Sequence, residues 1–147
     1  MNELEFEQFL HKQIPITKQM EISVIEFTPL KVRILTKLEP NLNHKCTAFG
    51  GSINSVMTVC GWAMVYSNIK EIDKEAHIVV QKSNINYLAP IDKDFIAECT
   101  LSDKKSREVF FKTYRKHNKA RISLKVTCSD EHIMLAEYRG QYVAFKW

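Results

Sequence analysis

The chain has 147 residues, of which 45% are hydrophobic and 26% are charged, with four glycines and four prolines. This composition excludes disordered and collagen-like chains, and the length suits a single domain spanning residues 1–147. The formal net charge of +4 is a mild excess that permits a polyanionic partner but does not indicate nucleic acid.

The cysteine pattern and the N-terminus both favour a reduced, cytoplasmic protein. The four cysteines form no Cys-x-x-Cys pair and no Cys/His spacing typical of zinc, so we expect no metal site. The segment from Met1 to Glu5 is acidic and lacks the basic start of a signal peptide. The most apolar window, Ile53 to Tyr66, is shorter than the ~20 residues that a bilayer needs, so no membrane span is predicted.

The start of the chain predicts one helix and two strands. Apolar residues recur at spacings of three and four over residues 1–15, which predicts an amphipathic helix that ends before Pro15. Residues 20–27 and 30–38 alternate apolar and polar side chains on either side of Thr28-Pro29. This pattern predicts two strands joined by a turn.

The one long uncharged stretch predicts a central helix over residues 50–68. One of its faces is bulky and apolar and comprises Ile53, Val56, Met57, Cys60 and Met64. The opposite face is small or polar and comprises Gly51, Asn54, Ser55, Thr58 and Gly61. We therefore expect one face to pack into the core and the other to border a crevice.

The remaining elements are four strands and one basic helix. The strands are expected over residues 77–88, 95–101, 120–129 and 132–145. The basic helix spans residues 103–119, with Val109, Phe110, Tyr114 and His117 on one side. Strands and helices do not alternate as in a doubly wound fold. The economical arrangement is therefore α+β, an antiparallel sheet curled around the uncharged helix.

Two glycines open the central helix. Because Gly50 and Gly51 carry no side chains, their backbone N–H groups can approach a substrate carbonyl closely and form an oxyanion site. The alternative is that the two glycines only allow tight packing at the start of the helix.

Three motifs, in this order along the chain, resemble those of the hotdog-fold thioesterases. They are Asn43, then Thr47-Ala48-Phe49-Gly50-Gly51-Ser52 with Gly61-Trp62 downstream, then Tyr87-Leu88-Ala89-Pro90. The Thr-Ala-Phe-Gly-Gly-Ser stretch is most similar to the thioesterase family named for the YiiD C-terminal domain. The resemblance implies a hotdog fold, a curled antiparallel sheet wrapped around a long central helix. It also implies hydrolysis of an acyl thioester, with no cofactor beyond the coenzyme A of the substrate.

The resemblance implies catalytic roles for three residues. Asn43 matches the residue that orients the thioester or the lytic water, and the Gly50 amide matches the donor to the thioester carbonyl. Thr58 stands where many relatives carry an acidic base or nucleophile. Residues 40–70 contain no Asp or Glu, so a carboxylate base cannot come from this helix. A threonine hydroxyl cannot act as a general base, so Thr58 can only hold a water. The alternative is that Thr58 bonds back to the carbonyl of Asn54.

Four further residues are predicted to bind substrate: Phe49, Gly51, Asn54 and Ser83. Two alternatives stay open, because Asn54 could pair across a subunit interface, and Ser83 with Gln81 could be ordinary outward-facing strand residues. His44 is either a base or a solvent-facing loop residue. Cys60 is expected in the core rather than as a nucleophile.

The leading hypothesis is a homodimer or dimer of dimers that hydrolyses an acyl-CoA or acyl carrier protein thioester. The acyl chain would lie in the crevice beside the central helix. A non-catalytic module that binds the same ligands is the second hypothesis, because the helix carboxylate is missing. The basic segment 104–121 is either a site for phosphates or an acidic carrier, or a solvated face. Nucleic-acid binding is a weak hypothesis, and a dehydratase would need a His–acid pair that the central segment lacks.

Overall fold

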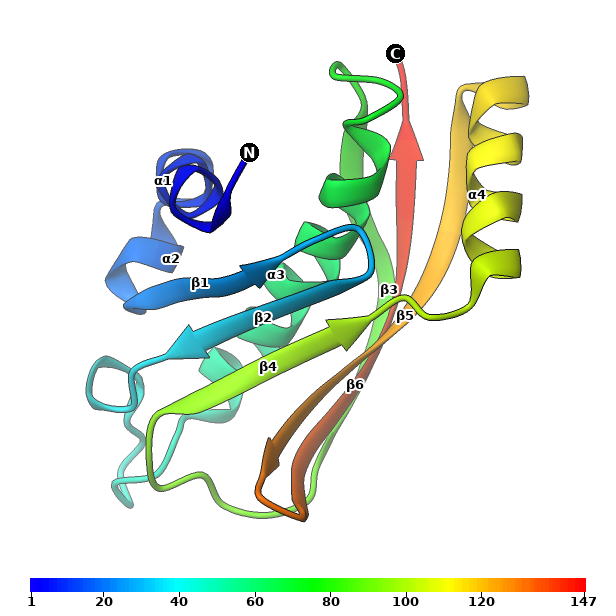
Figure 1. Ribbon diagram of the computed structural model, residues 1–147. Coiled ribbons are helices and arrows are strands. Elements are labelled where there is room, and N and C mark those ends of the chain that lie inside the picture. Colours follow the sequence, from blue (N-terminus) through cyan, green and yellow to red (C-terminus); the bar gives the residue numbers. More distant parts are fainter.

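The computed structural model describes residues 1–147 and contains one six-stranded sheet with a long helix against its concave face (Figure 1). The helices are α1 (Glu3–Gln13), α2 (Ile16–Gln19), α3 (Gly50–Ile69) and α4 (Lys104–His117), with a 3-10 turn, η1 (Glu39–Asn41). The strands are β1 (Ile22–Phe27), β2 (Lys31–Thr36), β3 (His77–Tyr87), β4 (Phe95–Thr100), β5 (Lys119–Asp130) and β6 (Ile133–Phe145). Their order is β1-β2-β4-β5-β6-β3, and every neighbouring pair is antiparallel.

The core lies between α3 and the concave face of the sheet. The bulky face predicted for α3 is buried as expected, with Val56, Met57, Cys60 and Met64 fully inaccessible to solvent. Alternate residues of β5 are buried against this helix, which is the period of a strand with one face in the core. The predicted α+β class and hotdog fold are therefore confirmed.

The N-terminal helix is shorter than predicted because a second helix follows it. Asn2 caps α1 by accepting a hydrogen bond from the Glu5 N–H, and the Glu5 carboxylate accepts one from the Asn2 N–H. The Phe6 ring anchors α1 by stacking on Phe27 of β1, with 4.0 Å between ring centroids. Helix α2 and η1 were not predicted, because a single turn leaves no periodic pattern to read.

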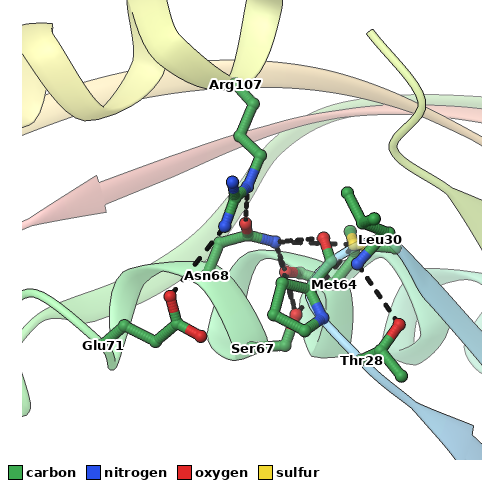
Figure 2. A network of polar contacts seen from close by, with 8 residues as sticks. Thr28, Leu30, Met64, Ser67, Asn68, Glu71 and Arg107 are labelled. Carbon is green, nitrogen blue, oxygen red and sulfur yellow. Dashed lines mark hydrogen bonds and ion pairs between the residues drawn. The ribbon is translucent and has the colours of Figure 1, made fainter. Parts of the chain in front are cut away.

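Helix α4 is attached to the end of α3 by a partly buried polar network (Figure 2). The Arg107 Nε donates to Asn68 Oδ1 at 2.6 Å, and Asn68 Nδ2 donates to the carbonyl of Pro29 in the β1–β2 turn at 3.0 Å. A second link joins the Tyr114 hydroxyl to the Asp73 carboxylate at 2.6 Å. These links join three segments that are far apart in sequence.

The face that α4 turns inward differs from the predicted one. Phe110 and Tyr114 are buried, as expected, but Val109 is 56% exposed and His117 is also exposed. The polar side chain of Arg107 takes the inward position instead, because Asn68 and the Phe111 ring receive its guanidinium. A pattern of apolar residues alone could not reveal an inward-facing arginine.

Strand β3 forms one edge of the sheet. Its inner side pairs with β6, and the pairing is interrupted by a bulge between Val80 and Lys82. The other side has no strand partner, and Val79 and Val80 are exposed there. Elsewhere in the fold, no helix is both long and apolar enough to span a bilayer.

Candidate functional site

The loop that leads into α3 is organised by Asn43. Its Oδ1 accepts hydrogen bonds from the backbone N–H groups of Lys45 and Thr47, and its Nδ2 donates to Thr47 Oγ1 at 2.8 Å. The second Nδ2 hydrogen makes only a long contact of 3.4 Å with the Ala48 carbonyl. Asn43 therefore holds the loop in shape and retains one weakly used donor.

The start of α3 leaves three backbone donors without partners. Phe49 takes the N-cap position in an extended conformation, and no side chain caps the helix. The N–H groups of Gly50, Gly51 and Ser52 consequently have no acceptor in the protein. Free donors at the positive end of a helix dipole stabilise negative charge, which is what a developing oxyanion requires.

Neither glycine is required by the backbone conformation. No glycine in the chain has a positive φ, and a methyl group at Gly50 would lie in ordinary contact, 3.4 Å, with the Tyr87 ring. A glycine inside a helix costs about 1 kcal/mol relative to alanine. At Gly51 the close Phe49 ring leaves no room for a side chain, whereas at Gly50 the physical advantage that remains is open access to the backbone N–H.

Two aromatic rings flank this helix start. The Phe49 ring covers Gly51 so closely that a methyl group there would lie 2.5 Å from it, and 56% of Phe49 is exposed. The Tyr87 hydroxyl donates to the Gly50 carbonyl at 2.9 Å. The predicted residues Phe49, Gly50 and Gly51 are thus brought together, and Tyr87 joins them from β3.

An apolar groove of about 460 Å³ begins one helical turn further along α3. It is lined mainly by apolar side chains of α3 and β3 and of the α1–α2 region: Ile14, Ile16, Val59, Trp62, Ile78, Val79 and Val80. Asn54 and Thr58 supply polar groups on one wall. This groove corresponds to the crevice expected beside the small and polar face.

Thr58 and Asn54 present different chemistry in this groove. The Thr58 hydroxyl donates to the Asn54 carbonyl at 2.8 Å, so the back-bonding alternative is correct and only the oxygen lone pairs face outward. The Asn54 Oδ1 is buried without any hydrogen-bond partner. A buried acceptor left unpaired is costly, so a donor from a ligand or a second chain is expected there.

A pair of buried tyrosines supports α3 at Thr58. The Tyr142 hydroxyl donates to the Thr58 carbonyl at 2.7 Å, and the Tyr138 hydroxyl lies 2.9 Å from it. Gly61 was expected at the crevice but is buried, because Tyr142 packs against it. The packing is so close that a methyl group at Gly61 would collide with the Tyr142 hydroxyl. Burial raises the pKa of Tyr142 far above its usual value, so this hydroxyl is a neutral donor and not a base.

Three other sequence candidates lie away from the groove. Ser83 lines a polar hollow of about 430 Å³ with Lys82, Lys125 and Arg139, and Gln81 lines another hollow. His44 is exposed in the loop. Within one chain, these residues are not gathered with Asn54 and Thr58.

Cys60 lies in the core, as expected. Its sulfur is 3.7 Å from the carbonyls of Val32 and Ala97, and burial raises the pKa of the thiol well above its usual value. A thiol in this state is not a nucleophile. No group of three His, Cys, Asp or Glu side chains is close enough together to hold a metal ion.

The sequence did not assign roles to two residues at the site. Tyr87 belongs to the Tyr-Leu-x-Pro motif, but its contact with Gly50 joins residues 37 positions apart. The position of Tyr142 in its strand is compatible with an inward side chain, but the sequence pattern does not show which helix carbonyl its hydroxyl contacts. Both contacts depend on how β3 and β6 pass beside α3.

Comparisons with known proteins agree with this architecture. Residues 3–146 match the family described as putative thioesterase (yiiD_Cterm). The chain is similar to the protein OLEI01261 of unknown function from Chlorobaculum tepidum TLS, with a TM-score of 0.91 and 28% identity over 99% of this chain and 94% of that chain. It is also similar to a putative thioesterase from Shewanella oneidensis, with a TM-score of 0.85 and 27% identity over 98% and 97% of the two chains. The protein PA5026 from Pseudomonas aeruginosa, a probable thioesterase, shares the fold at 19% identity, with a TM-score of 0.82 over 97% and 95%.

Proposed function

The chain belongs to the family of putative thioesterases of the yiiD C-terminal type, and from that membership we propose that it hydrolyses an acyl thioester. The observation that carries the proposal is the set of free N–H groups at Gly50, Gly51 and Ser52 beside an apolar groove. The thioester carbonyl would lie against these donors. The acyl chain would occupy the groove along α3.

Hydrolysis of a thioester proceeds through three events. A water oxygen attacks the thioester carbon, negative charge develops on the carbonyl oxygen, and the carbon–sulfur bond then breaks to release a carboxylic acid and a thiol. The N–H of Gly50, together with the neighbouring N–H of Gly51, would stabilise the charged oxygen. Asn43 would orient the thioester through its weakly used donor, and the lone pairs of Thr58 would hold the water.

The base that removes the water proton is not on α3, which carries no carboxylate. His44, next to Asn43 in the loop, is the candidate nearest to the site in sequence. Residues on β3 of a second chain are the other candidates. We propose a homodimer or dimer of dimers, in which Ser83 and Gln81 of one subunit reach the groove of the other.

The basic segment supplies a second reason to favour an anionic acyl carrier. Seven basic side chains in this segment form no ion pair in the structure: Lys104, Lys105, Lys112, Arg115, Lys116, Lys119 and Arg121. Across α4, β5 and β6, residues 104–147 carry 11 Lys and Arg against 4 Asp and Glu, whereas residues 1–103 carry 10 against 13. This surface would attract the phosphates of coenzyme A or the acidic surface of an acyl carrier protein.

The decisive experiment is a turnover screen over short, medium, long and aromatic acyl-CoAs, in which the release of free thiol is measured. A matched pair of variants then tests the oxyanion donor. Gly50→Pro removes the N–H at the first helical position, where proline is well tolerated, and the extended Phe49 is compatible with a following proline. Gly50→Ala keeps the N–H.

We expect Gly50→Pro to lower kcat by about 10²–10³-fold and Gly50→Ala to lower it much less. Equal losses in the two variants would count against the amide as the donor. A non-catalytic acyl binder is the second candidate function, favoured by the absence of a carboxylate on α3. Tight acyl-CoA binding without thiol release across the whole screen would establish it.

A further inference from the structure

Tyr87 lies outside the predicted site and contacts the Gly50–Gly51 peptide group at the start of α3. It lies on the edge strand β3, opposite the buried Ala136 of β6, so its ring points toward the helix. Its hydroxyl donates to the Gly50 carbonyl at 2.9 Å. The carbonyl of Gly50 and the N–H of Gly51 belong to one planar peptide group.

A hydrogen bond to the carbonyl of a peptide group polarises the whole group. Electron density moves toward the carbonyl oxygen, and the N–H on the other side becomes a stronger donor. At most helix starts this carbonyl would accept only from the N–H four residues later. Here a phenol provides an additional bond, and the N–H that it strengthens is one of the three free donors.

The same contact also fixes where these donors point. An unpaired first turn is the part of a helix that frays, and the two glycines at this start make fraying easier. The Tyr87 ring lies 3.4–3.5 Å from the position of a Gly50 methyl group, so it closes one side of the helix start. The Phe49 ring contacts the adjacent Gly51, so each of the two glycines has an aromatic ring beside it.

The geometry points to Tyr87 as a positioning residue that orients and polarises the Gly50–Gly51 peptide toward a thioester carbonyl. This inference rests on the proposed function and adds a residue for which the sequence indicated no role. Tyr87 acts through the peptide and does not itself exchange a proton. Its effect therefore belongs in the chemical step and not in substrate affinity.

The first test compares Tyr87→Phe with Tyr66→Phe, a matched loss of a hydroxyl from a tyrosine near the far end of α3. With the best acyl-CoA of the screen, Tyr87→Phe is expected to lower kcat about fivefold at unchanged KM, because one hydrogen bond is lost. Tyr66→Phe is expected to change neither constant. An unchanged kcat in Tyr87→Phe, or a rise in KM alone, would overturn the inference.

The second test observes the Gly51 amide directly by NMR. The chain has four glycines, so protein labelled with ¹⁵N-glycine gives four amide resonances. Tyr87→Phe should shift the Gly51 resonance and leave those of Gly61 and Gly140 in place, since both lie beside the Tyr138–Tyr142 pair. A Gly51 resonance that does not move would overturn the inference.

A third readout separates this inference from the proposed hydrolysis. An acyl-CoA with a ¹³C-labelled thioester carbonyl is bound to each protein, and the infrared carbonyl stretch is measured. Even if no thioester is hydrolysed, a smaller red shift in Tyr87→Phe than in wild type supports the positioning role, and equal red shifts overturn it. If wild type neither hydrolyses nor binds any acyl-CoA of the screen, both the function and the inference fail.

Discussion

At the scale of single residues, Asn43 shows how one side chain can serve both the fold and a reaction. Three of its four hydrogen-bonding positions are used on its own loop at 2.8–3.1 Å, and the fourth makes a 3.4 Å contact. The loop bonds place the remaining donor near the start of α3. A catalytic role for Asn43 therefore depends on the loop that it stabilises.

We expect Asn43→Ala to lower kcat strongly, by an amount that corresponds to about 2–4 kcal/mol of transition-state stabilisation. The loss of a preorganised donor is the physical reason. Thermal melts must first show that the variant folds, because the same substitution frees the Lys45 and Thr47 amides. Full turnover in a folded Asn43→Ala protein would transfer the role to His44 or to β3 of a second chain.

Thr58 should matter less than Asn43. Thr58→Val keeps the side-chain volume and removes a hydroxyl whose proton is already used on the Asn54 carbonyl, so we predict a smaller fall in kcat. Thr58→Asp is predicted to raise kcat, because it adds a carboxylate base to a helix that carries none. Steady-state kinetics on both variants check the prediction, and a larger loss in Thr58→Val than in Asn43→Ala would contradict it.

Residues of the site were predictable where local sequence decides their position. The free donors at Gly50 and Gly51 follow from two glycines at a helix start, and the back-bonded hydroxyl of Thr58 follows from helical spacing. Gly61 was misplaced because its neighbour, Tyr142, comes from a strand 81 positions later. Long-range packing of this kind leaves no local pattern.

At the scale of elements, the attachment of α4 decides how firmly the basic segment is held. Arg107 and Tyr114 both reach partners near the end of α3, and Asn68 also bonds the β1–β2 turn. The boundaries of α3 and α4 followed from the sequence to within two residues. The polar attachments did not, because they join side chains that lie 39 and 41 positions apart.

The Tyr114–Asp73 link predicts a pH-dependent stability. The Tyr114 hydroxyl, and next the Glu75 amide, lower the pKa of Asp73 in the folded protein. A carboxylate with a lowered folded pKa stabilises the protein above its unfolded pKa of about 4, and this contribution disappears as the pH falls. We expect the Tm of Tyr114→Phe to be lower than that of wild type at pH 7, with the difference shrinking below pH 4.

Asp73→Asn is the control for this prediction, because an amide cannot titrate. In that background the change in Tm caused by Tyr114→Phe should not depend on pH between about 3 and 7. The Tm values of wild type, the two single variants and the double variant are measured by thermal melts monitored by circular dichroism. A wild-type advantage that is constant across the pH range would show that Asp73 does not carry it.

At the scale of the whole molecule, the β3 edge and the open groove indicate an incomplete surface. An exposed edge strand with apolar side chains invites pairing with another chain. Asn54, whose Oδ1 is buried without a hydrogen-bond partner, is one of the residues that line the groove beside β3. We predict a homodimer at micromolar concentration, measured by light scattering.

A matched pair of substitutions tests whether the dimer contact lies at the β3 edge. Val80→Glu places a charge on the exposed edge strand, in the wall of the groove, and should yield monomers. Ile133→Glu changes a still more exposed apolar residue at the start of β6 and should leave the dimer intact. A monomeric wild type would remove the second wall of the proposed site. Dimers that persist in Val80→Glu would place the contact elsewhere.

The unequal division of charge between the two parts of the chain gives the molecule a permanent electric dipole moment. Its positive end is formed by α4 and the start of β5, where residues 104–121 carry 8 basic residues and 1 acidic residue. Near an anionic body the molecule therefore experiences a torque that turns α4 toward that body. Because dissolved salt shortens the reach of this torque, encounters should become orientationally random as the ionic strength rises.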